Sequence, residues 1–345
     1  MPRAEKSERP RRSSPLSSRR TERGGADLAA VIPAQKRTPP SARASRGKKA
    51  LPHEPSPLLP ARLQSVAHSY GYWQDVPWAV VNADACRALK ALPDNSVDCV
   101  VTSPPYYWQR DYGVKGQSGQ EDTVAAYVAN LTRVFRHIRR ALKKTGVAFL
   151  VLGDTYYSGR GRPHGGDPKQ IWRSVAREKY RAVDRPGMGL PRKSLIGIPW
   201  RVALALQKDG WVLRSAVTWR KPKGLAEPSV RDRPWNTSEI VFILAKRSSY
   251  WFDRRGLQGQ EDVWEIHAQS APRPYRHAGP FPEALVERCL ACGCKKGGLV
   301  LDPYVGSGTT LKVAVQRGSP AIGFELNPKY CRLAQRRIIF RKGNR

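Results

Sequence analysis

The 345-residue sequence has few acidic residues, no long apolar run and no regular cysteine pattern. Its 28 acidic residues face 61 Lys and Arg, which gives a formal net charge of +33. Self-repulsion at that charge favours a polyanionic partner, and nucleic acid fits because each neutralised phosphate releases counterions. No run is long enough to span a bilayer, and the basic N-terminus lacks the apolar segment of a secretory signal. These absences predict a cytoplasmic protein without a membrane partner.

The six cysteines are irregularly spaced, which argues against the disulfide framework of a small secreted domain. Only Cys289, Cys292 and Cys294 lie close together in the sequence. A second cysteine pair or a histidine pair would be needed to complete a zinc site, and the sequence offers neither. We therefore expect reduced, buried thiols and no bound metal.

Two regions differ in composition. Residues 1–65 are rich in Pro, Ser, Arg and Gly and show no periodicity, so they cannot bury enough surface to fold. Residues 1–63 hold fifteen Lys or Arg and five acids, which leaves a surplus of 23 basic residues in the remainder. We expect a disordered, dispensable basic tail over residues 1–65 and a folded domain, itself basic, over residues 66–345.

From Tyr70 onward, apolar runs and helical periodicities alternate. Strands are predicted at residues 78–81, 97–101, 147–152, 211–219, 240–245, 299–301 and 321–325, and helices at 86–92, 124–142, 195–207, 282–290, 308–317 and 329–340. This alternation predicts an α/β, Rossmann-like fold with a mainly parallel twisted sheet and helices on both faces. Irregular stretches rich in Arg, Gly and Pro, at about residues 158–192, 221–237 and 258–279, are expected to be inserted loops.

A glycine-rich turn, Asp302-Pro-Tyr-Val-Gly-Ser-Gly-Thr-Thr310, follows a predicted strand and opens a helix. Glycines let the backbone approach a nucleoside cofactor, and an acid ending the next strand, here Glu325, accepts hydrogen bonds from ribose hydroxyls. The Lys of a P-loop is missing, and Asp302 would repel a pyrophosphate, whereas it suits the ammonium and sulfonium of S-adenosylmethionine. The alternative is a tight turn without a ligand. The expected cofactor-binding residues in this region are Asp302, Tyr304, Gly306, Ser307, Gly308, Thr309 and Glu325.

A second motif, Thr102-Ser-Pro-Pro-Tyr106, follows the strand predicted at residues 97–101. Two consecutive prolines fix the backbone and remove two N–H donors, so the carbonyl of Pro104 can face a substrate without a competing donor. Two prolines in sequence are equally compatible with an ordinary rigid turn.

Together the Ser-Pro-Pro-Tyr tetrad and the glycine-rich turn resemble motifs of the amino-group DNA methyltransferases. Their order, with the tetrad first and the cofactor turn last, is similar to the circularly permuted β group. The resemblance runs from about residue 75 to 340 and includes Leu92–Asp98, Gly119–Glu121, Leu152–Asp154, Ile198–Arg201, Gly210–Arg214, Trp219–Pro222, Asp262–Glu265 and Pro280–Pro282. It implies S-adenosylmethionine as cofactor, double-stranded DNA as partner, and a restriction system with an endonuclease acting on the same site.

The first residue of the tetrad tends to follow the target base in this family: Ser with cytosine N4, and Asp or Asn with adenine N6. Ser103 therefore indicates cytosine, and adenine N6 stays open as the alternative. The resemblance implies that the Pro104 carbonyl and the Ser103 side chain hold the amino protons, with Pro105 fixing the backbone. Tyr106 is expected to stack on a base that has been flipped out of the duplex.

Three further residues receive roles from their positions, Asp84 because it ends a neighbouring strand. Asp154 ends a predicted strand, where it either polarises Ser103 or caps a helix or turn. Asp84 is expected near the adenine end of the cofactor, and Phe281 against its methionine part.

The pattern departs from the family around Lys221 and Glu239. Relatives often carry a His before each of these residues, and an Asn after Pro222, none of which is present here. These departures leave the DNA contacts open, and recognition of bases is expected from Arg160, Arg162, Arg173, Arg192, Arg231 and Arg233. Rival interpretations are methylation of RNA or of a protein glutamine, and a non-catalytic DNA-binding protein with this fold.

Overall fold

The computed structural model describes Ser56, Glu227 and residues 58–161, 181–222, 230–269 and 282–339. Within these residues the helices are α1 (Ala61–Gln64), α2 (Ala85–Ala91), α3 (Val124–Ala141), α5 (Ile198–Lys208), α6 (Glu283–Gly293), α7 (Thr309–Gln316) and α8 (Pro328–Ile339), with 3-10 turns η2 (Ala182–Asp184) and η3 (Arg254–Leu257). The strands are β1 (Ala67–Trp73), β2 (Val76–Asn82), β3 (Val97–Thr102), β4 (Leu142–Leu152), β5 (Val212–Arg220), β6 (Ser238–Ala245), β7 (Val263–Glu265), β8 (Val300–Asp302) and β9 (Ala321–Glu325).

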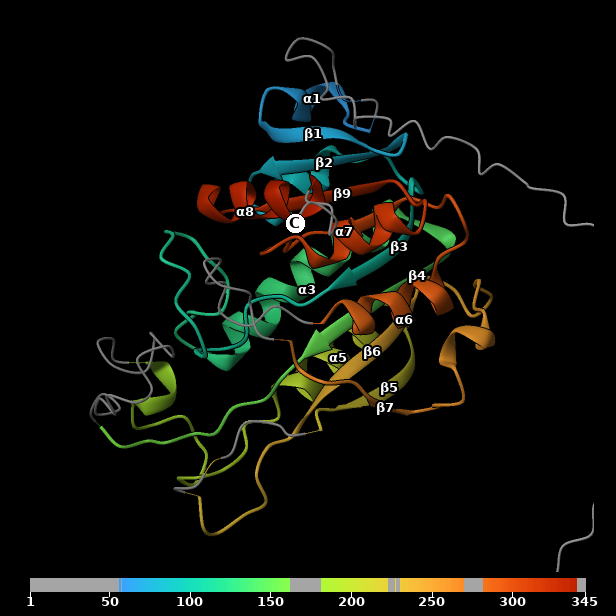
Figure 1. Cartoon of the computed structure of the whole chain (residues 1–345). Coiled ribbons are helices and arrows are strands. Elements are labelled where there is room, and N and C mark those ends of the chain that lie inside the picture. Colours follow the sequence, from blue (N-terminus) through green and yellow to red (C-terminus); the bar gives the residue numbers. More distant parts are fainter. Residues whose placement is uncertain are drawn as a thin grey trace, which may run out of the picture. The chain divides into compact units, whose positions relative to one another are not determined.

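The strands form one sheet in the order β1-β2-β9-β8-β3-β4-β6-β5-β7 (Figure 1). Strands β2, β9, β8, β3 and β4 are paired in parallel. Strand β6 lies antiparallel between β4 and β5, while β7 is parallel to β5 and β1 antiparallel to β2. All strands except β1 and β6 therefore run in one direction, which confirms the predicted mainly parallel sheet. Their last residues meet at one side, the carboxyl end of the sheet.

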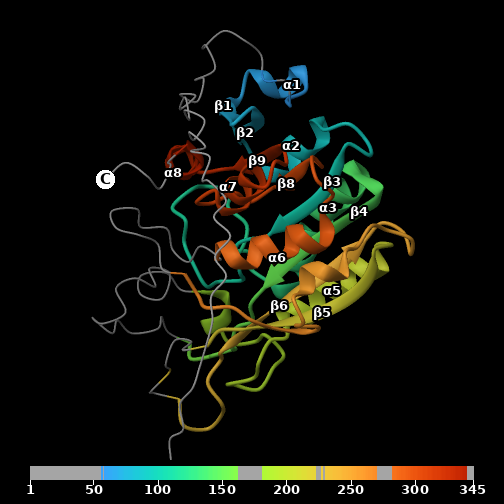
Figure 2. The ribbon, with the colours of Figure 1, turned by 45° about the vertical axis from the view of Figure 1, so that its right-hand side comes forward.

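The two faces of the sheet are covered by separate sets of helices. Alternate residues of β4 from Ala148 to Leu152 pack with α2, α3 and α5, whereas those from Val147 to Val151 pack with α6, α7 and α8. Figures 1 and 2 show the two sets on opposite faces. On the second face, Gly293 lets α6 approach the sheet, because a Cβ there would lie 2.3 Å from the ring of Phe149. The predicted helices on both faces are confirmed.

Three elements differ from the sequence prediction. Strand β1 pairs with β2 through a turn in which Gln74 and Asp75 both have positive φ. A tight turn of this kind usually has the sequence Asn-Gly, which is not present here. The three-residue strand β7 lies inside the stretch predicted as an irregular loop at residues 258–279. Leu59 and Leu63, within the predicted tail of residues 1–65, are buried against the domain next to α1.

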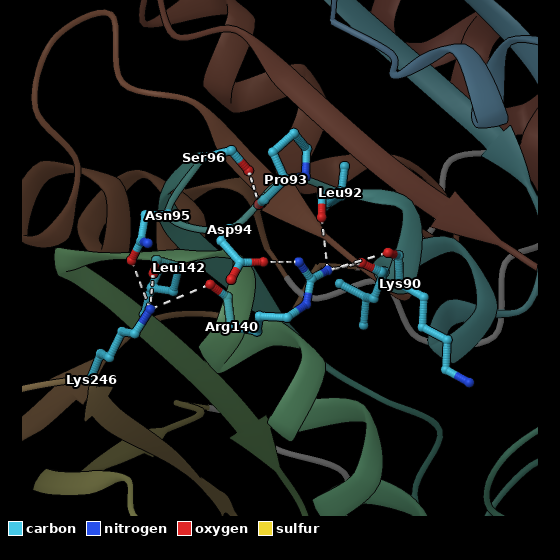
Figure 3. A network of polar contacts seen from close by, with 10 residues as sticks. Lys90, Leu92, Pro93, Asp94, Asn95, Ser96, Arg140, Leu142 and Lys246 are labelled. Atoms are coloured by element: carbon cyan, nitrogen blue, oxygen red, sulfur yellow. Dashed lines mark hydrogen bonds and ion pairs between the residues drawn. The ribbon is translucent and has the colours of Figure 1, made fainter.

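A network of polar contacts joins the elements at the opposite, amino end of β3 (Figure 3). Arg140, at the end of α3, donates to the carbonyls of Leu89 and Leu92 at 2.8 Å and pairs with Asp94. The ammonium of Lys246, which follows β6, donates to Asn95 Oδ1 at 2.8 Å and to the carbonyls of Arg140 and Leu142. These contacts satisfy carbonyls at the ends of α2 and α3 and hold the turn that leads into β3.

Within the described ranges, no helix is both long and apolar enough to cross a membrane. The same residues contain no group of three or more His, Cys, Asp and Glu side chains arranged to hold a metal ion. Cys289, Cys292 and Cys294 are buried free thiols.

Candidate functional site

The tetrad and the glycine-rich turn meet at the carboxyl end of the sheet. Strands β3 and β8 are neighbours in parallel register, and each motif begins where its strand ends. The hydroxyl of Thr102, before the tetrad, donates to Oδ1 of Asp302 at 2.7 Å. Residues 200 positions apart are thus joined directly, and the two predicted motifs line one site.

The two prolines of the tetrad differ in how their carbonyls are used. The Pro105 carbonyl accepts a hydrogen bond from the hydroxyl of Tyr127 at 2.9 Å, which fixes the tetrad against α3. The carbonyl of Pro104 accepts none from the described part of the chain. The tetrad therefore has one carbonyl that anchors it and one that is left for an external donor.

A chain of hydrogen bonds leads from Ser103 through Tyr106 to a residue not predicted as part of the site. The Ser103 hydroxyl donates to Tyr106 Oη at 3.2 Å, and Tyr106 donates to Glu239 Oε2 at 2.6 Å. The second oxygen of Glu239 pairs with the ammonium of Lys221. Burial, followed by the charge of Glu239, raises the pKa of Tyr106 well above its usual value, so this phenol keeps its proton.

The available sequence signal for Glu239 and Lys221 was their place in two family-like segments. Lys221 directly follows β5, and Glu239 is the second residue of β6. Because β6 runs antiparallel to its neighbours, its first residues lie at the carboxyl end of the sheet, beside the end of β4. Sequence spacing alone cannot show this, because it does not give the direction of β6.

The contacts of Asp154 favour the structural one of its two expected roles. Its carboxylate accepts from the backbone N–H groups of Thr155, Gly197 and Ile198 at 2.8–3.0 Å. Two of these amides lie at the first turn of α5, whose N-cap Gly197 has no side chain to satisfy them. Burial raises the pKa of Asp154, and these amides lower it.

Asp302 is fully buried, and only one of its oxygens is satisfied by good hydrogen bonds. Oδ1 accepts from Thr102 and from the N–H of Tyr304, whereas Oδ2 has no hydrogen-bond partner among the described residues. The hydroxyl of Thr310 lies near this carboxyl, but its hydrogen bond goes to the carbonyl of Val101. Burial raises the pKa of Asp302 to about 6. An ammonium group placed here would satisfy Oδ2 and favour the ionised form.

Glu325 ties the glycine-rich turn to the end of β9. Its two oxygens accept from the N–H groups of Gly306 and Asn327 at 2.9 and 2.8 Å. A carboxylate has about four acceptor positions, so two remain for the hydroxyls of a ribose. Gly308, with φ of 82°, leaves no room for a side chain, because a Cβ would lie 2.8 Å from Cα of Ala334 in α8.

The hydroxyls of Ser307 and Thr309, both predicted cofactor contacts, point to a partly buried arginine. Arg337 of α8 donates to the Ser307 carbonyl at 3.0 Å and to Thr309 Oγ1 at 3.1 Å, and also contacts Ser307 Oγ. Burial lowers the pKa of Arg337, while its contact with Glu283 of α6 raises it. These side chains therefore hold the turn in place from within the protein.

A cavity of about 650 Å³ lies next to Glu325 and is lined in part by Tyr112, Asn327 and Tyr330. The rings of Tyr112 and Tyr330 are 6.0 Å apart, and Asn327 Nδ2 donates to the Tyr112 carbonyl at 2.9 Å. The lining also contains Lys329, Arg332 and Arg336, and the volume is sufficient for the adenine of a cofactor whose ribose is predicted to bind Glu325. Of these residues, Asn327 could have been suspected, since it directly follows the strand that ends in Glu325.

The other predicted residues are distributed as follows. Asp84 is the N-cap of α2 and accepts from the N–H of Arg87 at 2.9 Å, so its carboxylate has a local role. Arg233, a predicted DNA contact, pairs with Glu227 and stacks over the ring of Tyr156 at 3.9 Å, which makes it part of the loop structure. Arg160, Arg192 and Arg231 are exposed, and Phe281, Arg162 and Arg173 lie outside the described residues.

Comparison with known proteins identifies the class. A family model described as DNA methylase of the N6/N4 type matches residues 97–336. The chain is 40% identical over 274 residues to the Type II methyltransferase M.SmaI of Serratia marcescens, covering 76% of this chain and 91% of that protein. It is 38% identical over 264 residues to M.Cfr9I of Citrobacter freundii, covering 74% and 85% of the two chains.

Solved structures with the same fold include the cytosine-N4-specific PvuII DNA methyltransferase, with a TM-score of 0.60, 20% identity and coverage of 78% and 88%. Another is TTHA0409 of Thermus thermophilus, whose structure is a complex with S-adenosylmethionine, with a TM-score of 0.51, 22% identity and coverage of 75% and 92%. The predicted fold and cofactor, S-adenosylmethionine, are confirmed. The chain belongs to the N6/N4 family of DNA methyltransferases.

Proposed function

We propose that this enzyme transfers the methyl group of S-adenosylmethionine to N4 of cytosine in double-stranded DNA, as the modification enzyme of a Type II restriction system. The observation that carries the proposal is a pair of acceptors, the Pro104 carbonyl and the Ser103 hydroxyl, next to the glycine-rich turn. The Ser at the first position of the tetrad favours cytosine over adenine. The similarity to M.SmaI and M.Cfr9I, both named as Type II methyltransferases, supports the restriction setting.

An exocyclic amino nitrogen is a poor nucleophile, because its lone pair is delocalised into the ring. The Pro104 carbonyl and Ser103 Oγ accept its two N–H bonds, which favours a pyramidal nitrogen and frees the lone pair. The bound cofactor supplies an electrophilic methyl group on a sulfonium, with a neutral thioether as leaving group. Since the leaving group is already good, alignment of nitrogen and methyl supplies most of the acceleration.

The cofactor residues act by charge and shape. Asp302 offers Oδ2 to the ammonium of the methionine part, and Glu325 offers its remaining acceptor positions to the ribose. Gly306 and Gly308 let the backbone lie close to the ligand, and Arg337 of α8 holds the turn by a hydrogen bond to the Ser307 carbonyl. A base inside a duplex cannot reach this site, so it must be flipped out, at a cost of a few kcal/mol.

The product distinguishes the candidate activities. Unmethylated genomic DNA is incubated with the protein and S-adenosylmethionine, digested to nucleosides and analysed by mass spectrometry. We expect N4-methyldeoxycytidine. N6-methyldeoxyadenosine would contradict the cytosine assignment, and methylation of RNA or protein without any methylation of DNA would contradict DNA as the substrate.

A further inference from the structure

We propose that Glu239, held by Lys221, is a positioning residue that fixes Ser103 as a hydrogen-bond acceptor toward the amino group of the target base. The inference rests on the proposed function, because it concerns how the tetrad receives an amino group. Neither residue touches the reacting atoms, and Glu239 acts on Ser103 through Tyr106.

The direction of the hydrogen bonds follows from the chemistry of each group. A carboxylate only accepts, so Glu239 Oε2 forces the single proton of the Tyr106 hydroxyl toward itself, at 2.6 Å. Tyr106 Oη can then only accept from Ser103, at 3.2 Å. With its proton committed to Tyr106, Ser103 Oγ presents only lone pairs to a substrate. An N–H donor satisfies this arrangement, and an acceptor such as a ring nitrogen does not.

Lys221 fixes the orientation of the Glu239 carboxylate, which is the last group in this series of hydrogen bonds. An ammonium only donates, and it contacts Oε1 of Glu239, so both oxygens of Glu239 receive a proton donor. The side chains of this pair are 20% and 18% exposed, so solvent screens their contact less than that of a surface ion pair. The Lys221 ammonium also lies 4.5 Å from the centre of the Trp219 ring, which limits its movement.

The ring of Tyr106 is held where its hydroxyl can bond to both Ser103 and Glu239. A Cβ on Gly153, directly after β4, would lie 2.7 Å from Cε2 of Tyr106, so only glycine allows the ring to lie there. The register of the sheet places Glu239 opposite Trp219, on the strand beside Gly153. Gly153 after β4 and Glu239 of β6 therefore both fix Tyr106, and Lys221 after β5 fixes Glu239.

Replacing Glu239 with Gln should reverse the direction of hydrogen-bond donation between residue 239, Tyr106 and Ser103. Lys221 donates only, so it selects the amide oxygen of Gln and turns the amide NH₂ toward Tyr106. Tyr106 then accepts from Gln and donates to Ser103, whose own proton points at the substrate. Two donors would face each other at the reacting nitrogen. Removing the ammonium as well, in Lys221→Met with Glu239→Gln, lets the amide rotate and present its oxygen to Tyr106.

The experiment measures kcat and KM for methyl transfer to unmethylated genomic DNA, together with the affinity for S-adenosylmethionine and the melting temperature. For Glu239→Gln we expect kcat to fall about 100-fold, as when one preorganised catalytic hydrogen bond is lost, with unchanged cofactor affinity. The double variant Lys221→Met/Glu239→Gln should recover part of this loss. If the pair only stabilised the fold, kcat would follow the melting temperature, because Lys221 left without its partner destabilises the fold and removal of both partners relieves this loss. We therefore expect the fall and the partial recovery of kcat at an assay temperature well below the melting temperature of every variant.

Two further variants complete the test. Tyr106→Phe removes the hydroxyl between Ser103 and Glu239 without reversing the direction of donation. Its kcat should therefore lie between those of the wild type and Glu239→Gln. Glu287→Gln changes the carboxylate of a different ion pair, formed with Arg317 between α6 and the end of α7, and should leave kcat unchanged. The inference is overturned if the double variant is no faster than Glu239→Gln, or if Tyr106→Phe is slower than Glu239→Gln.

The nucleoside formed by the wild type tests the proposed function separately. N6-methyldeoxyadenosine would overturn the cytosine assignment alone, because adenine also offers an amino group, and the ranking of the variants would still decide the role of Glu239.

Discussion

The two ends of strand β3 use their hydrogen-bonding groups in opposite ways. At the amino end, Arg140 and Lys246 satisfy the carbonyls of α2 and α3 from within the chain (Figure 3). At the carboxyl end, the Pro104 carbonyl accepts nothing from the described residues, and Asp302 Oδ2 is buried without a hydrogen-bond partner there. A buried polar atom without a partner destabilises a fold, and a ligand that donates a hydrogen bond to Asp302 Oδ2 would remove this cost.

This difference separates stability from activity between the two ends of the sheet. Substitutions at the amino end should lower the free energy of unfolding and leave turnover per folded molecule unchanged. Substitutions at the carboxyl end of groups left for a ligand, such as Ser103 and Asp302, should lower turnover or cofactor affinity with little effect on stability. The following predictions are ordered from the largest expected effect to the smallest.

The largest effect is expected for Ser103→Ala. This change removes one of the two acceptors that we propose for the amino nitrogen, so kcat should fall about 100-fold or more. Affinity for S-adenosylmethionine, measured by calorimetry, and the melting temperature should stay at wild-type values. Loss of cofactor binding in this variant would contradict the assignment of the tetrad to the target base.

At the amino end, Arg140→Met should lower the free energy of unfolding by about 2 kcal/mol, because the carbonyls of Leu89 and Leu92 lose their donor. Urea denaturation measures this change. The kcat of the folded fraction should equal that of the wild type. A loss of kcat in Arg140→Met with unchanged stability would contradict the difference between the two ends.

Cofactor affinity should depend on pH through Asp302. Burial raises its pKa to about 6, so the folded protein without cofactor favours the neutral form, and the stability set by this group falls as pH rises toward 6. A bound ammonium favours the carboxylate, so affinity should rise about tenfold per pH unit up to about pH 6 and then level off.

Asp302→Asn is the matched control for this pH dependence. It should bind S-adenosylmethionine more weakly and lose the rise toward pH 6. Glu325, whose pKa burial also raises, remains in this variant and accounts for any residual slope. An unchanged slope in Asp302→Asn would assign the titration to Glu325 instead.

The smallest effect is expected for Asp154→Asn, which sharpens the contrast because Asp154 lies at the carboxyl end. Its carboxylate caps α5, so loss of one acceptor should lower the free energy of unfolding by about 1 kcal/mol. Its kcat should fall much less than that of Ser103→Ala. A loss as large as that of Ser103→Ala, without destabilisation, would show that Asp154 polarises Ser103.

Much of the sheet and the meeting of the two motifs followed from the sequence. Long periodic helices such as α3 and buried strands such as β3 have local signals, and parallel strands bring their carboxyl ends to one side. Strands β1 and β7 lacked such signals, because the first is joined by an atypical turn and the second has only three residues. The direction of β6 was also hidden, and with it the position of Glu239.

Side-chain roles were harder to predict than positions. Asp154, Ser307 and Thr309 lie at the predicted end of the sheet, but their side chains contact backbone amides or Arg337. Which partner a polar side chain takes depends on elements distant in sequence, such as α5 and α8. Spacing within a motif carries no information about these elements.

The most direct test is a crystal structure with S-adenosylhomocysteine bound. The ribose hydroxyls should contact Glu325, the ammonium should contact Asp302, and the sulfur should face the carbonyl of Pro104 across a gap that fits a methyl group. A ligand bound away from the glycine-rich turn, or one whose sulfur faces away from Pro104, would contradict a shared site at the carboxyl end of the sheet.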